Sequence, residues 1–147
     1  MEEQSWSVRE AHWLPDREGL LSVRTTVFVI EQGVDVSVER DGRDGDCLHA
    51  IAEGPDGLPI GAGRISGKGK VGRIAVLKQW RGHGVGSAIM HELLRQAQLS
   101  GMPSTYLHSQ SWAADFYLRF GYRPEGDEFL EAEIPHLKMV RSTDDMG

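Results

Sequence analysis

The segment Arg73–Leu94, with the sequence RIAVLKQWRGHGVGSAIMHELL, decides how this chain folds. Its apolar run at 74–77 contains β-branched residues and predicts a short strand. A turn rich in glycine follows. Beyond the turn, apolar residues recur at helical spacing, at Val85, Ala88, Ile89 and Leu93. A strand, a glycine turn and the start of a helix therefore follow one another directly.

The glycine turn has the features of an anion-binding site. Its glycines lack Cβ atoms, so a ligand could approach the backbone closely there. The start of the following helix offers N–H groups without intrahelical partners, and it carries the positive end of the helix dipole. A diphosphate group suits such a site. The candidate contacts are Arg81, Gly82, His83, Gly84, Val85, Gly86 and Ser87.

Glycine turns before helices also occur in two other nucleotide-binding folds, and the spacing argues against both. A dinucleotide turn has the pattern G-x-G-x-x-G with an acidic residue about 20 positions later, and a P-loop has G-x-x-x-x-G-K-[ST]. Here residues 81–86 are RGHGVG, with no Lys-Ser/Thr after them. A dinucleotide-binding oxidoreductase is therefore a distant candidate. A glycine connector without any ligand is the structural alternative.

The composition limits the class of protein to which the chain can belong. Its 147 residues predict one domain, residues 1–147, long enough to bury a core. The net charge of −6 argues against a general nucleic-acid binder, which would show a basic stripe. The sequence contains no run of 18 apolar residues, so no membrane span is expected. The single Cys47 and the lack of a secretory leader predict a reducing cytoplasm, and the histidines show no metal-ligand spacing.

The remaining pattern predicts an α+β fold with a mixed, mostly antiparallel sheet. Runs typical of strands lie at 6–11, 47–52, 60–65, 71–76 and 105–108, with two more at 122–124 and 129–140. Helices are expected after Pro15-Asp16 through Leu20, Val23, Val27 and Ile30 or Glu31, from about 84 to 100, and from Gln110 or Ser111 to Phe120. The long helix is a crossover, so the strands before and after it form a parallel pair. By analogy with open α/β sheets, a ligand can lie where their ends diverge.

The stretch from Asp35 to Asp46 lacks periodicity and is acidic. It contains five acidic residues and only two basic ones, Arg40 and Arg43. A solvated loop is the default interpretation. The functional alternative is an electronegative rim that attracts a cationic amine, and the sequence leaves both open.

Several motifs resemble those of the GNAT N-acetyltransferase superfamily. The R-x-x-G-x-G pattern after a strand resembles its acetyl-CoA pyrophosphate loop, and residues 116–122, FYLRFGY, resemble its F-Y-x-x-x-G-F/Y segment. Segments spread over residues 20–140 resemble the ElaA-type members: Val23-Arg24, VFVIEQ at 27–32, His49, HSQ at 108–110 and IPHLKM at 134–139. The resemblance covers nearly the whole chain. It implies a GNAT-like sheet with one splayed pair of parallel strands and helices on both faces.

The resemblance also implies an activity, the transfer of the acetyl group of acetyl-CoA to a primary amine of a small molecule or protein. A protonated amine has a pKa of about 10 and must lose a proton before its nitrogen can attack. A departing thiolate, whose parent thiol has a pKa of about 8.5, benefits from a proton donor. Charge that develops on the thioester oxygen needs a fixed hydrogen-bond donor. No metal is required for these roles.

The family's motifs suggest residues for two of these roles. Tyr117 stands where the family places the acid that faces the sulfur. The Val76 N–H is the candidate oxyanion donor, because this strand splays from its neighbour in the family. Backbone groups of Ile74, Ala75 and Val76 are expected to pair with the pantetheine arm as an added strand would. Gln110 stands where many GNATs have an asparagine that contacts this arm.

The general base has two candidates. Glu31 lies at the end of a helical stripe, where an acid suits a pocket better than a core, although it could instead pair with Arg24. His108 ends the strand beside the proposed sulfur site, and a histidine is suited to accept a proton near neutral pH. The sequence favours Glu31 slightly and allows a water relay. His136 suits a structural or substrate-pocket role.

Two classes of function stay open at this point. One is the N-acetyltransferase, and the other is a catalytically weak acyl-CoA-binding or interaction module on the same scaffold. Apolar residues in the C-terminal strands are compatible with a sheet shared by a homodimer. The sequence does not name the acetyl acceptor.

Overall fold

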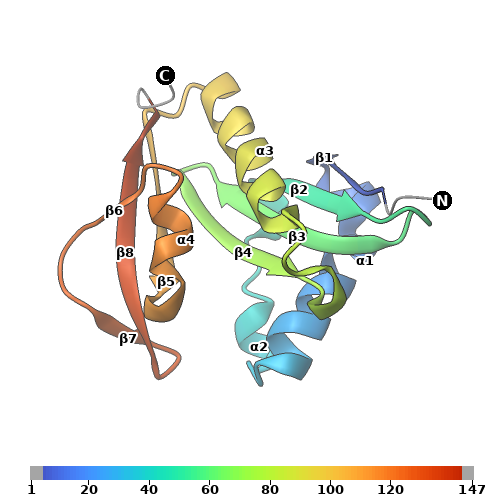
Figure 1. Cartoon of the computed structure of the whole chain (residues 1–147), viewed down its shortest axis with the longest axis horizontal. Helices are drawn as coiled ribbons and strands as arrows, with labels where there is room; N and C mark the ends of the chain where they lie inside the picture. Colours follow the sequence, from blue (N-terminus) through green and yellow to red (C-terminus); the bar gives the residue numbers. More distant parts are fainter. Residues whose placement is uncertain (1–4, 144–147) are drawn as a thin grey trace.

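The computed structural model describes residues 5–143, and their strands form one mixed eight-stranded sheet (Figure 1). The strand order is β1-β2-β3-β4-β5-β8-β6, and β7 pairs with β8 beside this path. Among the described strands, β4 and β5 pair in parallel and the other pairs are antiparallel. The bounds are β1 Ser7–Ala11, β2 Cys47–Glu53, β3 Pro59–Ser66, β4 Lys70–Val76, β5 Ser104–Gln110, β6 Arg123–Pro124, β7 Phe129–Glu131 and β8 Ile134–Ser142. The predicted α+β class with one parallel pair is confirmed.

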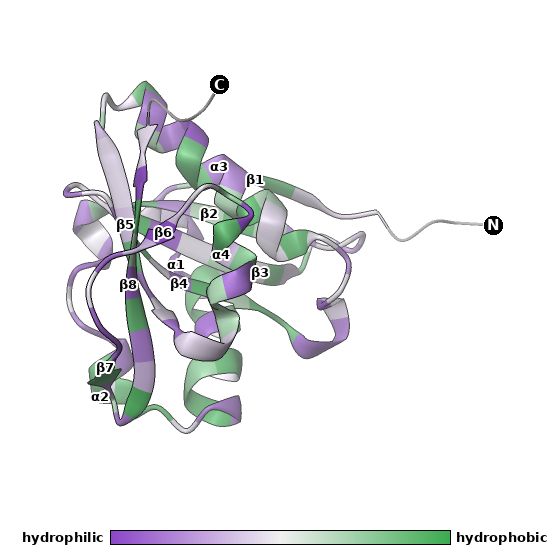
Figure 2. Ribbon diagram, turned by 60° about the vertical axis from the view of Figure 1, so that its left-hand side comes forward, coloured by the Kyte–Doolittle hydropathy of each residue, from purple (hydrophilic) through white to green (hydrophobic). Residues whose placement is uncertain are grey.

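Helices cover both faces of this sheet (Figure 1). One apolar cluster includes Ile89 and Leu93 of α3, and a second includes Leu20 and Val23 of α1 on the opposite face. In Figure 2, α3 carries both apolar and polar stretches, as a helix with one buried side requires. The helices are α1 Trp13–Arg24, α2 Val36–Glu39, α3 Val85–Leu99 and α4 Ala114–Leu118, with a π-helix η1 Thr25–Glu31 and 3-10 turns η2 Asp44–Asp46, η3 Lys78–Trp80 and η4 Ser111–Ala113.

A β-bulge in β4 shapes the sheet next to the glycine turn. Gly63 of β3 faces two residues of β4, Arg73 and Ile74, and Arg73 has a φ of 53°. A Cβ added at Gly63 would lie 2.7 Å from an α3 side chain, so the glycine allows α3 to pack closely there. The parallel pairing of β4 with β5 ends at Val71 and its partner Leu107, just before the bulge. Because a bulge bends its strand and increases its twist, β4 and β5 diverge from this point.

The first helix differs from the prediction at its C-terminal end. Leu20, Val23 and Val27 are buried as expected, but Ile30 is 74% exposed. The α-helical hydrogen bonding ends at Arg24, and the chain continues as the π-helix η1. A π-helix has more residues per turn than an α-helix, so the last residues of the expected stripe turn away from the core.

In the acidic stretch at 35–46, three of the five acids bind arginines, whereas Asp35 caps α2 and Asp46 is exposed. Arg24 Nε lies 2.7 Å from Glu39 Oε2, and Arg24 Nη1 lies 2.7 Å from Asp44 Oδ1. Arg64 bonds to Asp44 at 2.8 Å and to Asp41 at 2.5 Å. Arg24 and Glu39 are each only 1% exposed. This network ties the stretch to α1 and β3, and the arginines offset its negative charge.

The C-terminal region has three strands where the sequence predicted two. A turn with positive φ at Ala132 (51°) and Glu133 (65°) separates β7 from β8. The third predicted helix also begins differently from the prediction, because neither Gln110 nor Ser111 caps it with a side chain and the turn η4 precedes α4. Within the described residues, no helix has the length and hydrophobicity needed to cross a bilayer.

Candidate active site

The glycine turn leads from η3 directly into the N-terminus of α3. Gly82 and Gly84 have φ values of 83° and 85°, a region that a side chain rarely tolerates. No side chain of the described residues caps α3 at Gly84. The Ala88 N–H donates to the Gly84 carbonyl at 3.0 Å. The three preceding N–H groups, at 85–87, have no intrahelical acceptor and are available to an anion.

Three elements converge at Gly86. A Cβ added there would lie 3.6 Å from Phe116 Cζ and 3.8 Å from Val76 Cγ2. Phe116 belongs to α4, and Val76 is the last residue of β4. The end of the splayed strand, the start of α3 and the aromatic helix α4 therefore meet at one point.

The Val76 amide is directed away from β3, toward the side of β5. The neighbouring Leu77 N–H donates to the Ile60 carbonyl at 2.9 Å. Hydrogen-bonded pairs alternate with non-hydrogen-bonded pairs in an antiparallel ladder, so the next pair, Val76 with Gly61, turns its backbone groups outward. The Val76 carbonyl accepts a hydrogen bond from Arg81 Nε at 2.9 Å. β5 does not pair with β4 at this level.

Arg81 links the glycine turn to the end of η1. Its two terminal nitrogens lie 2.7 Å from the two carboxylate oxygens of Glu31. The hydrogen bonds from Arg81 lower the pKa of the Glu31 carboxyl, and the same contact raises the pKa of Arg81. Arg24, the partner that the sequence suggested for Glu31, binds Glu39 and Asp44 instead.

Tyr117 lies on α4 with its ring packed among other aromatic rings. The ring centroids of Phe116 and Tyr122 are 5.0 Å and 6.3 Å away, both edge-on. Burial, together with the neighbouring Tyr122 hydroxyl, raises the pKa of Tyr117 to about 12. Within the described part of the chain, its hydroxyl has no hydrogen-bond partner. The phenol is therefore protonated at neutral pH and able to donate to a ligand.

His108 and Tyr117 lie on opposite faces of the sheet. Leu107 belongs to the apolar cluster against which Tyr117 packs. Successive side chains of a strand alternate between faces, so the next residue, His108, projects from the other face. His108 is also the first residue of β5 beyond the pairing with β4. It stands where the two strands begin to diverge.

A carboxylate of the β7 hairpin holds His108. Glu131 Oε1 lies 2.9 Å from His108 Nδ1, and Glu131 Oε2 lies 3.8 Å from His136 Nε2. The Phe129 ring packs edge-on against His108 with a centroid distance of 5.1 Å. When Nδ1 carries the proton and donates to the carboxylate, His108 Nε2 is left as a proton acceptor. His136 is buried and its Nδ1 contacts the Ile134 carbonyl.

The other candidate residues take several environments. Gln110 accepts a hydrogen bond from Trp112 Nε1 at 2.5 Å through its amide oxygen. His83 is exposed, and its ring packs edge-on against Trp80 with a centroid distance of 5.7 Å. Ala75 is buried. The remaining candidates, Ile74, Val85, Gly86 and Ser87, lie within β4 and the first turn of α3.

The fold brings the β4, glycine-turn and α4 candidates together, whereas Glu31 is occupied by Arg81. Sequence reasoning missed Glu131 as the partner of His108. The pairing of β7 with β8 makes that contact, because it opposes Glu131 to Ile134 and Phe129 to His136. The alternation of apolar and polar residues around Pro135 could have indicated a hairpin. The register of β7 against β8, however, depends on the turn with positive φ at Ala132 and Glu133.

Comparison with known proteins identifies the family at this point. Residues 21–143 match the family described as "Acetyltransferase (GNAT) domain". The chain belongs to the GNAT acetyltransferase family. The N-acetyltransferase YjcF of Bacillus subtilis, described as uncharacterized, is 41% identical, over 81% of this chain and 87% of its own length.

Solved GNAT structures share the whole fold. Escherichia coli ElaA superposes with a TM-score of 0.83 at 26% identity, over 94% of this chain and 100% of its own. An acyl-CoA N-acyltransferase from Pseudomonas aeruginosa superposes with a TM-score of 0.80 at 28% identity, over 95% of this chain and 100% of its own. The resemblance to GNAT proteins of the ElaA type is confirmed. The protein is an N-acetyltransferase.

Proposed function

We propose that this GNAT protein transfers the acetyl group of acetyl-CoA directly to a primary amine of a small molecule or protein. The divergence of β4 from β5 after Val71 and Leu107 carries the proposal, because it opens backbone groups beside an uncapped helix N-terminus. When bound, the coenzyme supplies the acetyl group as a thioester. The Pseudomonas aeruginosa neighbour is described as an acyl-CoA N-acyltransferase, which supports the same donor class.

The residues around the glycine turn fit a diphosphate-bearing ligand. The N–H groups at 85–87 suit the diphosphate, and Gly82 and Gly84 keep the backbone accessible. The outward backbone groups of Ile74 and Val76 suit the amides of the pantetheine arm as an added strand. Gln110 can contribute to the same arm only if its amide turns away from Trp112.

The Val76 N–H is the proposed donor to the thioester oxygen. It points toward the divergence, and strand pairing with β3 holds its direction. A donor fixed in this way needs no reorganisation when charge develops on the oxygen.

Tyr117 is the proposed acid for the departing thiol. Its pKa of about 12 keeps the hydroxyl protonated, and the low polarity of its surroundings strengthens a hydrogen bond to a thiolate. It approaches from the face that α3 and α4 cover.

His108, positioned by Glu131, is the proposed base. Two observations favour it over Glu31, which the sequence preferred slightly. The ion pair with Arg81 lowers the pKa of the Glu31 carboxyl and occupies both of its oxygens. His108 lies where the strands diverge, on the face opposite Tyr117. Acid and base on opposite faces suit a direct transfer, because amine and thiol then lie on opposite sides of the carbonyl carbon.

The test of this function combines binding and turnover. Calorimetry with acetyl-CoA should show binding, and release of free thiol should depend on an added amine across a panel of small and peptide amines. Binding without turnover over a broad panel would favour the catalytically weak acyl-CoA module. Absence of acetyl-CoA binding would contradict the proposal outright, and NAD(P) is not expected to compete with CoA. A location in the cytoplasm and a homodimer are further predictions, to be checked by fractionation and sedimentation.

A further inference from the structure

Arg119 is a cation next to the glycine turn for which the activity described so far provides no role. Its guanidinium carbon lies 5.6 Å from the centroid of the Phe116 ring. Phe116 in turn is the residue that a Cβ at Gly86 would meet first, at 3.6 Å. The exposed Arg119 is therefore separated from the N-terminus of α3 by a single aromatic ring.

Arg119 also lacks an acidic partner. Within residues 5–143 it forms no ion pair, Asp115 one helical turn earlier included. Arg81, the other arginine at the turn, is bound to Glu31. In a chain with a net charge of −6, an arginine that lies over a ring beside an anion site without an acidic partner is available to bind an anion. Stacking restricts the guanidinium plane, so it loses less conformational freedom on binding a phosphate.

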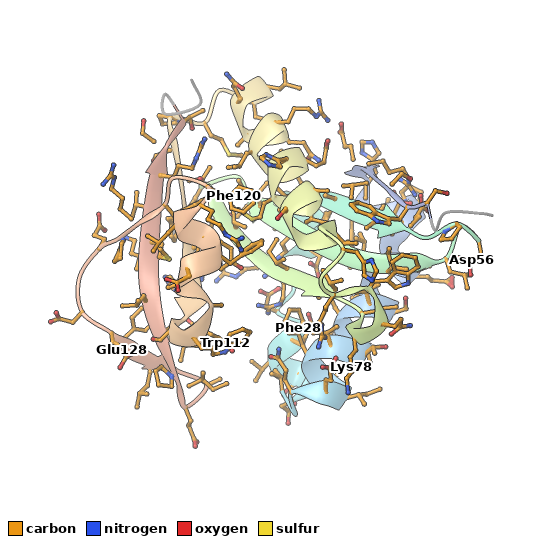
Figure 3. The ribbon with its side chains drawn as sticks, viewed as in Figure 1. Phe28, Asp56, Lys78, Trp112, Phe120 and Glu128 are labelled. Atoms are coloured by element: carbon orange, nitrogen blue, oxygen red, sulfur yellow. The ribbon has the colours of Figure 1, made fainter. Side chains whose placement is uncertain are left out.

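The nucleotide of a ligand bound at the turn can leave in two directions. On one side lies Trp80, where a Cβ at Gly54 would meet Asp56 Oδ1 at 3.4 Å and Trp80 Cζ2 at 3.5 Å. A carboxylate there repels phosphate. On the other side lie Phe116 and Phe120. Phe120, labelled in Figure 3, lies between the end of α4 and α3. Charge favours this side.

We propose that Arg119 binds the 3′-phosphate of CoA, so that the protein distinguishes CoA from 3′-dephospho-CoA. The proposal rests on acetyl-CoA as the donor. The N–H groups at 85–87 serve the diphosphate, which leaves the phosphate monoester on the ribose without a partner. That monoester carries a charge of about −1.5 to −2 at pH 7 and three acceptor oxygens. The planar fork of an arginine donates to two such oxygens at once.

The test measures affinity for both nucleotides by calorimetry at one fixed salt concentration. The unmodified protein should bind CoA about tenfold tighter than 3′-dephospho-CoA, the lower end for a charge-assisted hydrogen bond. Arg119→Gln should lose this ratio and keep its affinity for 3′-dephospho-CoA. Arg119→Lys keeps the charge without the planar stack and should retain only part of the ratio.

Lys68→Gln is the matched control, because it removes one exposed charge at the turn before β4, at the end remote from Gly82. It should leave the ratio unchanged. An equal ratio in the unmodified protein and in Arg119→Gln overturns the inference, as does an equal loss in Lys68→Gln. If neither nucleotide binds the unmodified protein, the proposed donor fails as well, so the two failures are distinguishable.

Discussion

At the level of the single residue, the proposed acid Tyr117 and the proposed base His108 have opposite requirements. An acid must keep its proton until the thiol departs, and the aromatic surroundings of Tyr117 raise its pKa to about 12. A base must present an unprotonated nitrogen, and the carboxylate of Glu131 at Nδ1 leaves Nε2 of His108 for that purpose. The two environments differ because they lie on different faces of β5.

Tyr117→Phe should lower kcat by about 10² or more if chemistry limits the rate, the lower end of general acid catalysis. The ring and its packing persist, so affinity for CoA should change little. An acetyl donor with a better leaving group needs the proton less and should lose less rate. Near-parental kcat in Tyr117→Phe, with chemistry shown to be rate-limiting, would reduce Tyr117 to a packing residue.

His108→Ala should lower kcat by about 10² and flatten the acidic limb of the pH–rate profile. Glu131→Gln should lower kcat less, because His108 then loses the carboxylate that orients its ring. Glu31→Gln should leave the limb in place. Glu128→Gln serves as the control, because it removes a nearby carboxylate that, among residues 5–143, is bound only to Ser111. A parental kcat in both His108→Ala and Glu131→Gln contradicts this assignment of the base.

The element that carries the proposed coenzyme site is the connection from β4 to α3. The bulge at Arg73 and Ile74 turns β4 away from β5, and the turn at Gly82 and Gly84 then aims α3 at the opening. Each feature depends on a backbone conformation. Small changes of side chain at these points should therefore affect ligand binding more than stability.

Gly86→Val should weaken CoA binding by at least tenfold in a chain that remains folded. A Cβ at Gly86 meets Phe116 and Val76 at ordinary contact distances, but the additional methyl groups have no room and crowd the diphosphate. Gly72→Val in β4 is the control, because a Cβ at Gly72 meets nothing within 4 Å. Calorimetry with CoA and circular dichroism measure the two effects. Unchanged affinity in folded Gly86→Val would refute the assignment of the loop.

At the scale of the molecule, the network of Arg24, Arg64 and their acids holds the segment at 35–46 against the sheet. Burial alone would raise the pKa of Asp44, but hydrogen bonds from Arg24 and Arg64 outweigh it and lower the pKa below the ordinary 3.8. Arg64 likewise lowers the pKa of Asp41. A carboxyl with a lowered folded pKa stabilises the protein above its unfolded pKa. This contribution is lost as the pH falls through the folded value.

Asp44→Asn should reduce the free energy of unfolding at pH 7 by about 3 kcal/mol, because it leaves buried arginine charge without its counterion. The difference in the free energy of unfolding between the variant and the unmodified protein should have its full value above pH 3.8 and shrink as the pH falls below 3.8. Urea unfolding at pH 7 and pH 3 measures both values. Asp46→Asn, an exposed acid of the same turn, should change stability by less than about 0.5 kcal/mol. A difference independent of pH would contradict the linkage to Asp44.

Local pattern was sufficient for most of the fold. The strands at 47–52, 60–65 and 71–76, and the helix from about 84 to 100, agree with the structure within a few residues. These predictions succeed because hydrophobic periodicity and glycine chemistry act within a few residues of the chain. The π-helix η1 was not predicted, since its hydrogen bonding is a local departure that leaves the apolar spacing nearly unchanged.

The sequence by itself determined the glycine turn, the strand that feeds it and the aromatic segment around Tyr117, whereas the splay of that strand was expected only from the resemblance to the family. Tertiary structure alone decided which charges meet. Glu31 binds Arg81, Asp44 binds Arg24, and Glu131 binds His108, over separations of 50, 20 and 23 residues. An ion pair of this kind depends on where two elements come together in space. Periodicity records only which side of an element is buried, so it leaves the partner of each charge open.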